Sequence, residues 1–279
     1  MAELPATAAT VTATTSLGVY RRLVAARIRA DWQYRTSFFL FLAGQTLVAV
    51  LDFATIAVIF TAVDALAGWS VGEVAYLYGT SGLAFGLADL FVSPIDRAGL
   101  HIRAGSFDGF LVRPLGTVWQ LLGVEFGLRR VGRTFQPAVV LVVALTRADM
   151  AWGPDDLLLV VISVVAGATI YGGLWVVTTA PTFWVIDALE AANSFTYGGQ
   201  YLSQFPIDVM GRWLRRIATF VVPMASVAYL PGCRLFDKPM PSGLPRWVAW
   251  TGPLVALAMV VAARAAWSFA VRRYRSTGS

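Results

Sequence analysis

The chain has 279 residues, of which 57% are hydrophobic and 14% charged, with a mean hydropathy of +0.66 and a net charge of +6. A soluble domain carries roughly 25% charged residues, so this chain has too little polar surface to cover a water-exposed globule. Composition therefore excludes an ordinary soluble protein and predicts an integral membrane protein.

Nearly all of the positive charge is arginine, because Lys238 is the only lysine. Basic clusters in so apolar a chain favour contact with anionic lipid headgroups over nucleic acid, and we expect no nucleic-acid partner. The single cysteine, Cys233, excludes an intrachain disulfide.

The first residues, 1–15, are rich in Ala and Thr and lack the basic start and apolar core of a signal peptide. We predict that they form a disordered cytoplasmic tail and that 16–279 form one membrane domain. Residues 16–36 mix apolar and basic side chains at helical spacing, which indicates an amphipathic helix in the headgroup plane. The alternative interpretation is a positive flank that only orients the first span. The interfacial residues are Arg21, Arg22, Arg27, Trp32 and Arg35.

Six segments approach the roughly 20 apolar residues that a membrane-crossing helix needs. The third and fifth contain charged residues, and the second contains the pattern Gly82-xxx-Gly86, which permits close helix approach. The predicted spans are 37–63, 74–92, 118–146, 157–180, 183–203 and 247–269.

Arginine placement predicts the orientation, since positively charged loops remain cytoplasmic. Arginines precede the first span, follow the last and separate the second from the third. An even number of spans puts all of these on one side, with both termini cytoplasmic. A second basic cluster, within 212–246, then falls outside. Either the rule is overridden there, or 199–216 is cytoplasmic and a short span, 217–232, follows.

Two connecting segments are too polar or too broken to span. Residues 95–114 are Gly-rich and predict a small cytoplasmic helix between turns that presents a knob to a partner, or else an ordinary positive loop. Residues 206–232 contain two short apolar stretches broken by Pro223 and Pro231. Two short helices that dip into the outer leaflet and return would fit them, provided that protein buries their irregular backbone.

Several ionisable and aromatic side chains fall inside or near the predicted spans. A charge at a helix centre costs roughly 2.5–3.5 kcal/mol on insertion scales, so these charges should pair, face the bundle or lie near the interface. A role in a transport path and helix-to-helix salt bridges both remain open. The candidates are Asp52, Asp89, Glu125, Arg129, Phe183, Trp184, Asp187, Glu190 and Asn193.

No ATP-binding phosphate loop can exist in this chain, because Lys238 follows the residues CRLFD and not a glycine-rich stretch. Metal-ligand spacings and hydrolase motifs are missing from the sequence as well. We therefore expect no catalysis by this chain alone and no cofactor on it.

Three stretches resemble the ABC-2 family of ABC transporter permeases, and within it the bacterial six-span subgroup encoded as paired permeases beside an ATPase. They are GSFDGFLVRP at 105–114, the aromatic-Pro, basic and Pro-containing segment at 205–232, and the closing RYRSTGS. The resemblance implies an all-α membrane protein with six transmembrane helices of type V exporter-like architecture. It also implies an N-terminal amphipathic interfacial helix, a cytoplasmic coupling helix and short re-entrant outer helices before the last span.

The same resemblance implies partners and site residues. A separate ATPase subunit would bind ATP and Mg, and a second permease, a paralogue or another copy, would complete an exporter in the bacterial plasma membrane. The segment at 205–231 would cap the outer end of the path through Pro206, Trp213, Pro223 and Pro231. The residues assigned to ATPase coupling are Asp96, Arg97, His101, Arg103, Phe107, Asp108, Arg113 and Pro114.

Two other functions remain as alternatives. A proton-coupled secondary transporter would use intramembrane carboxylates such as Asp187 and Glu190 as relays. A membrane scaffold would recruit a soluble partner through the arginine-rich cytoplasmic face.

Overall fold

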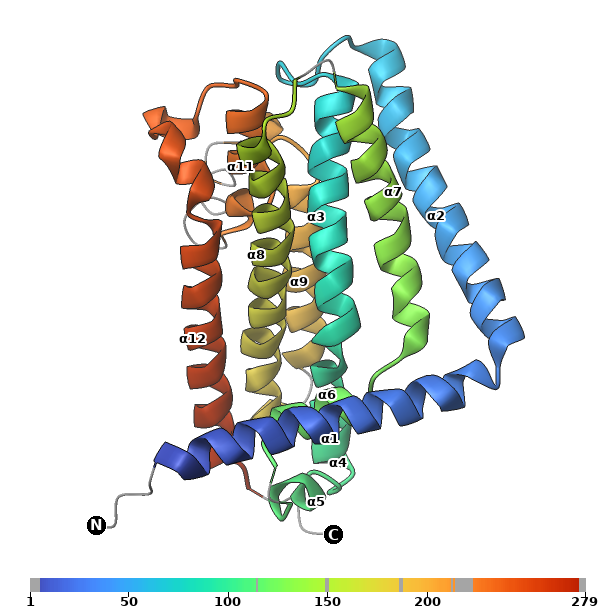
Figure 1. Ribbon diagram of the computed structural model, residues 1–279, viewed down its shortest axis with the longest axis vertical. Coiled ribbons are helices and arrows are strands. Elements are labelled where there is room, and N and C mark those ends of the chain that lie inside the picture. The colour runs from blue at the N-terminus through green and yellow to red at the C-terminus, as the bar shows by residue number, and fades with distance from the viewer. Residues whose placement is uncertain are drawn as a thin grey trace.

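The computed structural model describes residues 6–113, 115–148, 151–185, 188–211, 213 and 223–275. Within these ranges the regular secondary structure is entirely helical. One helix, α1 (Ala6–Trp32), lies across one end of the bundle (Figure 1). The helices that run along its long axis are α2 (Arg35–Ala62), α3 (Val71–Phe91), α7 (Gly132–Arg147), α8 (Pro154–Thr179), α9 (Ala188–Ser203) and α12 (Gly252–Arg272).

Three stretches of the described chain are long and apolar enough to cross a membrane: Val71–Phe91, Pro154–Phe183 and Gly252–Arg272. They correspond to the second, fourth and sixth predicted spans. An all-helical membrane protein is therefore confirmed, and the count of six spans stays a prediction.

Helix α1 begins at Ala6, so the predicted disordered tail is wrong for residues 6–15. The alanines of this stretch have the highest helix propensity of any residue and extend the helix; residues 1–5 lie outside the described part of the chain. Tyr20 of α1 makes an edge contact with Trp119 at 5.7 Å. Through this contact α1 packs against the short helix α6 (Thr117–Val124).

The third and fifth spans are not the continuous helices that hydropathy predicted. Residues 118–146 divide into α6, a 3-10 turn at Leu128–Val131 and α7, because Gly127 and a group of charged residues interrupt the apolar run. The fifth segment begins as a 3-10 turn, Ala180–Phe183, since Pro181 cannot continue the hydrogen-bond ladder of α8. Helices α7 and α9 therefore have 16 residues each.

Helix α3 is the central element, buried against α7, α8 and α9. Three of its glycines form the face that meets α7. A Cβ atom at Gly79, Gly82 or Gly86 would lie within 2.7–2.9 Å of atoms of Leu141, Pro137 or Thr134. The close approach expected from Gly82-xxx-Gly86 is confirmed, and Gly79 extends that face by one turn.

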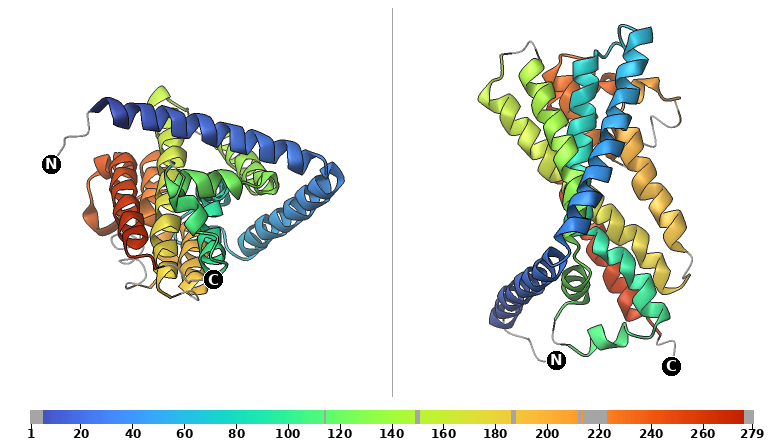
Figure 2. Two further views of the ribbon diagram at one scale, coloured as in Figure 1. Left: turned by 90° about the horizontal axis from the view of Figure 1, so that it is seen from below. Right: turned by 90° about the vertical axis from the view of Figure 1, so that its right-hand side faces the viewer.

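Helix α1 and both termini lie at one end of the bundle, and short helices cover the other end (Figures 1 and 2). Tyr229 of α11 (Tyr229–Leu235) donates a 2.6 Å hydrogen bond to Asp208 Oδ2. Lys238 pairs with Glu73 at the start of α3, with 2.8 Å between Nζ and Oε2. The Lys238–Glu73 pair ties the segment to the bundle, and the Tyr229–Asp208 bond joins two parts of the segment itself. The other short helices here are Ile207–Val209, Met224–Ser226, Pro241–Gly243 and Arg246–Trp250.

The proline-containing outer segment thus divides into buried and exposed parts. Pro206 and Pro231 are buried, Pro223 precedes Met224–Ser226, and Trp213 is 78% exposed. Residues 223–232 form short helices at this end, which disagrees with the alternative of a span at 217–232. Residues 214–222 lie outside the described part of the chain.

We expect Gly79→Val to destabilise the bundle, because its side chain would meet the Leu141 backbone and force α3 and α7 apart. Overpacking of this kind costs roughly 1–3 kcal/mol. Thermal unfolding of the detergent-solubilised protein should show a lower Tm. The matched control is Gly72→Val in the first turn of α3, where no atom lies within 4 Å of the added Cβ. Equal melting of the two variants would contradict the tight α3–α7 contact.

Candidate functional site

The segment between α3 and α6 projects from the same end of the bundle as α1 and the two termini (Figure 1). It contains a 3-10 turn, Ser93–Arg97, followed by α4 (Ala98–Arg103) and α5 (Asp108–Leu111). Gly105 adopts φ +67° between α4 and α5, a conformation that favours glycine. The small helix predicted at 95–114 is therefore two short helices joined at a glycine. We call residues 93–113 the projecting segment.

Some of the predicted coupling residues lie on the outer surface of the projecting segment. Others hold the segment to the bundle, and we call these the anchor. Arg97, Arg103 and Arg113 are exposed, whereas Phe107 is fully buried. His101 and Asp108 are half-buried, and Pro114 lies outside the described residues.

Asp96 belongs to the anchor. Its carboxylate accepts hydrogen bonds from Trp175 Nε1 at 3.1 Å and from Thr179 Oγ1 at 3.2 Å. Both donors lie on α8, so the 3-10 turn is fastened to a predicted span. Burial raises the pKa of the Asp96 carboxyl to about 6, while the two hydrogen bonds and the Arg130 guanidinium oppose that rise.

Phe107 joins the projecting segment to the ends of other helices. Its ring meets Phe183, after α8, at 5.2 Å and Tyr274, after α12, at 5.1 Å, both edge-on. Phe110 lies 6.0 Å away. Edge-to-face aromatic pairs contribute roughly 0.5–1.5 kcal/mol each beyond their buried area, so this aromatic cluster holds the segment in place.

Helix α6 fixes the other side of the segment. Gln120 Nε2 donates to the carbonyls of Phe110 and Leu115, at 2.9 and 2.7 Å. His101 Nε2 lies 3.2 Å from Glu125 Oε1, and His101 Nδ1 lies 2.9 Å from Ser106 Oγ. Glu125 was predicted as a candidate for the transport path; it instead contacts the projecting segment.

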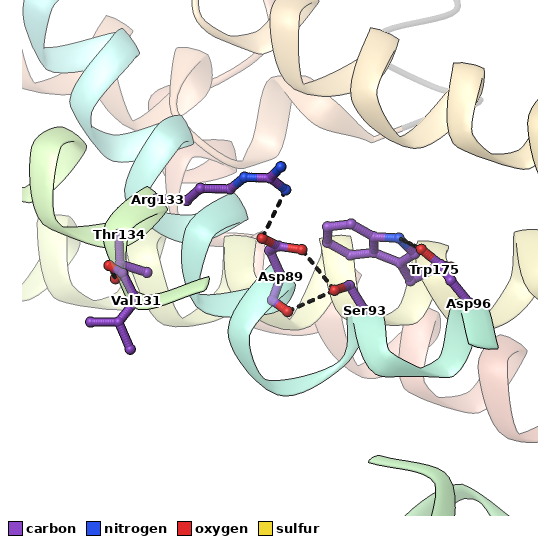
Figure 3. A network of polar contacts seen from close by, with 7 residues as sticks. All are labelled: Asp89, Ser93, Asp96, Val131, Arg133, Thr134 and Trp175. Carbon is purple, nitrogen blue, oxygen red and sulfur yellow. Dashed lines mark hydrogen bonds and ion pairs between the residues drawn. The ribbon is translucent and has the colours of Figure 1, made fainter. Parts of the chain in front are cut away.

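A polar network of Asp89, Ser93 and Arg133 lies beside the contact between Asp96 and Trp175 (Figure 3). Arg133 of α7 donates to Asp89 Oδ2 of α3 at 3.0 Å, and Ser93 donates to Asp89 Oδ1 at 2.7 Å. The Asp89 side chain is 2% exposed and that of Arg133 is 40% exposed. The sequence left open whether such a charge belongs to a transport path or to a salt bridge between helices. For Asp89 the structure shows the salt bridge.

Arg133 also borders a polar cavity of about 270 Å³ between α2, α3, α7 and α9. Sequence reasoning missed this cavity. Uncharged amides inside otherwise apolar segments were the available signal, because an amide in hydrocarbon needs a partner or water. The polar side chains that line the cavity are Gln45, Tyr78, Arg133, Gln136, Tyr197, Gln200, Tyr201 and Gln204.

Among the described residues, the other predicted path residues do not line this cavity. Phe183 is buried in the aromatic cluster, and Trp184 lies 5.6 Å from Phe269 on an exposed face. Glu190 is exposed and Asn193 is half-buried on α9. Asp187 and the side chains of Asp52 and Arg129 lie outside what the structure describes.

The residues predicted to lie at the membrane interface are on α1 and at the start of α2. Arg21, Arg22 and Trp32 are exposed on α1, and Arg35 begins α2. Arg27 is anchored, since its Nε donates to the carbonyl of Phe126 at 3.3 Å. Within the described residues no group of three His, Cys, Asp or Glu side chains could hold a metal ion.

Comparison with known families decides the class of the protein. A family model described as ABC-2 family transporter protein matches residues 46–278, which is most of the chain. The chain belongs to the ABC-2 transporter family. It is therefore a transmembrane permease component of an ABC transporter, a transport subunit and not an enzyme. No curated protein and no solved structure showed significant similarity to this ABC-2 permease.

We expect Arg133→Gln to destabilise the permease by about 1–3 kcal/mol, because Asp89 is left buried without a counter-charge. Partial exposure of Arg133 keeps the effect below that of a fully buried pair. Adding Asp89→Asn should restore part of the loss, and denaturant unfolding of both single variants and the double variant in detergent measures the coupling. Additive losses would show that the ion pair contributes nothing.

The raised pKa of Asp96 predicts a pH-dependent stability. A carboxyl that binds its proton more tightly when folded favours the folded state at low pH. Stability should therefore fall as the pH rises from 3.8, the ordinary pKa of an aspartate carboxyl, to about 6, and should then level off. Asp96→Asn should flatten this step in Tm measured against pH, whereas Asp155→Asn, at the far end of α8, should keep it. An unchanged step in Asp96→Asn would refute the assignment.

Proposed function

We propose that this permease is the membrane subunit of an ATP-driven exporter and that a separate ATPase subunit drives it. It would cross the bacterial plasma membrane six times, through α2, α3, α7, α8, α9 and α12, with both termini cytoplasmic. Family membership supports the transporter class. The arrangement of the six helices along one axis, with both termini at the same end, supports the even span count (Figure 1).

The observation that carries the proposal is the construction of the projecting segment. Its outer surface presents Arg97, Arg103 and Arg113, while Asp96 and Phe107 fasten it to the bundle. A partner that pushes on the outer surface would therefore move the ends of α8 and α12 as well. This is what a coupling element requires, and we assign the ATPase contact to it. ATP and Mg would be bound by that partner.

The polar cavity is our candidate for half of the transport path. Helix α2 packs mainly on α7, and it leaves Leu47, Leu51 and Val58 exposed. In the views of Figure 2, α2 stands away from α9, and these two helices form outer walls of the cavity. A second permease, a paralogue or another copy, would cover this face and close the path. Directionality would come from different substrate affinities in the inward-open and outward-open states.

The opposite end of the bundle would face outward. The short helices on each side of residues 214–222 would cap the outer end of the path, as the predicted re-entrant segment does. The pairing of Lys238, just after α11, with Glu73 of α3 supports this role, because a cap must stay in place while the spans move.

We expect the double substitution Arg97→Glu/Arg103→Glu to reduce the amount of ATPase subunit that copurifies with the tagged permease by at least about tenfold. Reversing two charges at the rim of an interface creates repulsion where there was attraction. The matched control is Arg147→Glu, an exposed arginine in the last turn of α7 at the opposite end. Copurification is measured from native membranes by quantitative immunoblot and nucleotide hydrolysis.

Two results would overturn the proposal. One is an ATPase complex that survives the double substitution intact. The other is ATP hydrolysis by the purified permease alone.

A further inference from the structure

A second cavity, of about 730 Å³, lies between α3, α6, α8 and α12. Its volume falls in the range of roughly 300–1,000 Å³ that is typical of ligand pockets. Its walls are apolar, with Phe91, Leu122, Val165, Val176 and Val260 among the lining residues. The polar cavity has different walls, apart from its share of α3. We call the second cavity the apolar groove.

The groove opens toward the surface where lipid would lie. Leu158, Val161 and Val165 of α8 and Leu257 and Val261 of α12 are all exposed beside it. Large apolar side chains exposed on two predicted spans are solvated by acyl chains in a bilayer. The groove is therefore continuous with a lipid-facing surface.

The groove lies in the half of the bundle nearer to α1, and aromatic side chains mark its base. Trp267 Nε1 donates to Thr117 Oγ1 at 3.0 Å and so ties α12 to α6. Trp119 lines the groove, is 46% exposed and contacts Tyr20 of α1. Tryptophans gather at the level of lipid headgroups, which places the base of the groove at that level.

One charged side chain lines this apolar groove. Arg264 is exposed and makes no hydrogen bond or ion pair with any described residue. No carboxylate is among the described residues that line the groove. Arg264 lies eight residues, or about 12 Å, before Arg272 at the end of α12. A long arginine side chain at this depth extends toward the interface to reach phosphate oxygens. Ser268, one turn further along the same face, adds a hydroxyl donor.

We propose that the apolar groove binds one anionic phospholipid from the leaflet that contacts α1. The acyl chains occupy the apolar groove between α8, α12 and α3, and the phosphate binds Arg264 and Ser268. The unpaired cation determines the choice of an anionic lipid. Helix α6 lines the groove, and its Gln120 holds the projecting segment. The bound lipid therefore supports that segment from the membrane side.

Native mass spectrometry of the full-length permease in detergent tests this assignment. The probes are phosphatidylglycerol and phosphatidylcholine with identical acyl chains. We expect wild type to retain phosphatidylglycerol about fivefold better, the factor that corresponds to one arginine at an anionic surface. Arg264→Gln should abolish that preference. Arg272→Gln, the matched control on the same helix outside the groove, should keep it.

A second variant separates the acyl site from general headgroup attraction. Ala168→Phe places a large side chain in the groove and should reduce retention of both lipids, while gel filtration confirms that the variant stays monodisperse. Equal retention of the two lipids by wild type overturns the proposal, and so does an equal loss of preference in Arg272→Gln and Arg264→Gln. Unchanged lipid retention in Ala168→Phe also overturns the proposal, and it would assign the groove to another occupant such as cargo.

Discussion

The close packing of α3 on α7 sets the positions of most other features of this permease. Glycines at 79, 82 and 86 remove the side chains that would hold the two backbones apart, so α7 lies directly on the central helix. The same approach brings Arg133 within 3.0 Å of Asp89 and neutralises a carboxylate that is almost fully buried. It also forms one wall of the polar cavity. A small change in helix distance would therefore alter packing, charge pairing and cavity shape together.

The projecting segment shows how a surface element can be fastened to a membrane bundle. Asp96 accepts hydrogen bonds from two donors on α8, and Phe107 packs on residues that follow α8 and α12. Helix α6 holds the segment from the other side through Gln120. Charged arginines remain on the outside, where water solvates them. This division between a buried anchor and a charged surface is the basis on which we propose force transfer through the segment.

The two cavities differ in chemistry because they face different surroundings. The cavity between α2 and α9 is lined by amide, phenol and guanidinium groups, which are stable in a bilayer only where protein or water satisfies them. The groove between α8 and α12 is apolar, and its Arg264 pairs with no residue in the part of the chain that the structure describes, which suits acyl chains below a phosphate. Helix α3 contributes to both. We therefore propose the first as part of a transport path and the second as a lipid site.

Hydropathy and charge by themselves determined the membrane class and the positions of α2, α3, α8 and α12 within a few residues. These properties depend on side chains close together in the chain. Sequence could not determine where α6 separates from α7, which side of the projecting segment is anchored, or that amides from α2, α7 and the C-terminal end of α9 meet around a cavity. Asp96 and Trp175 are 79 residues apart, and Asp89 and Arg133 are 44 apart. Only the packing of the helices decides such pairings, because the free energy of burying a polar group depends on which distant group meets it.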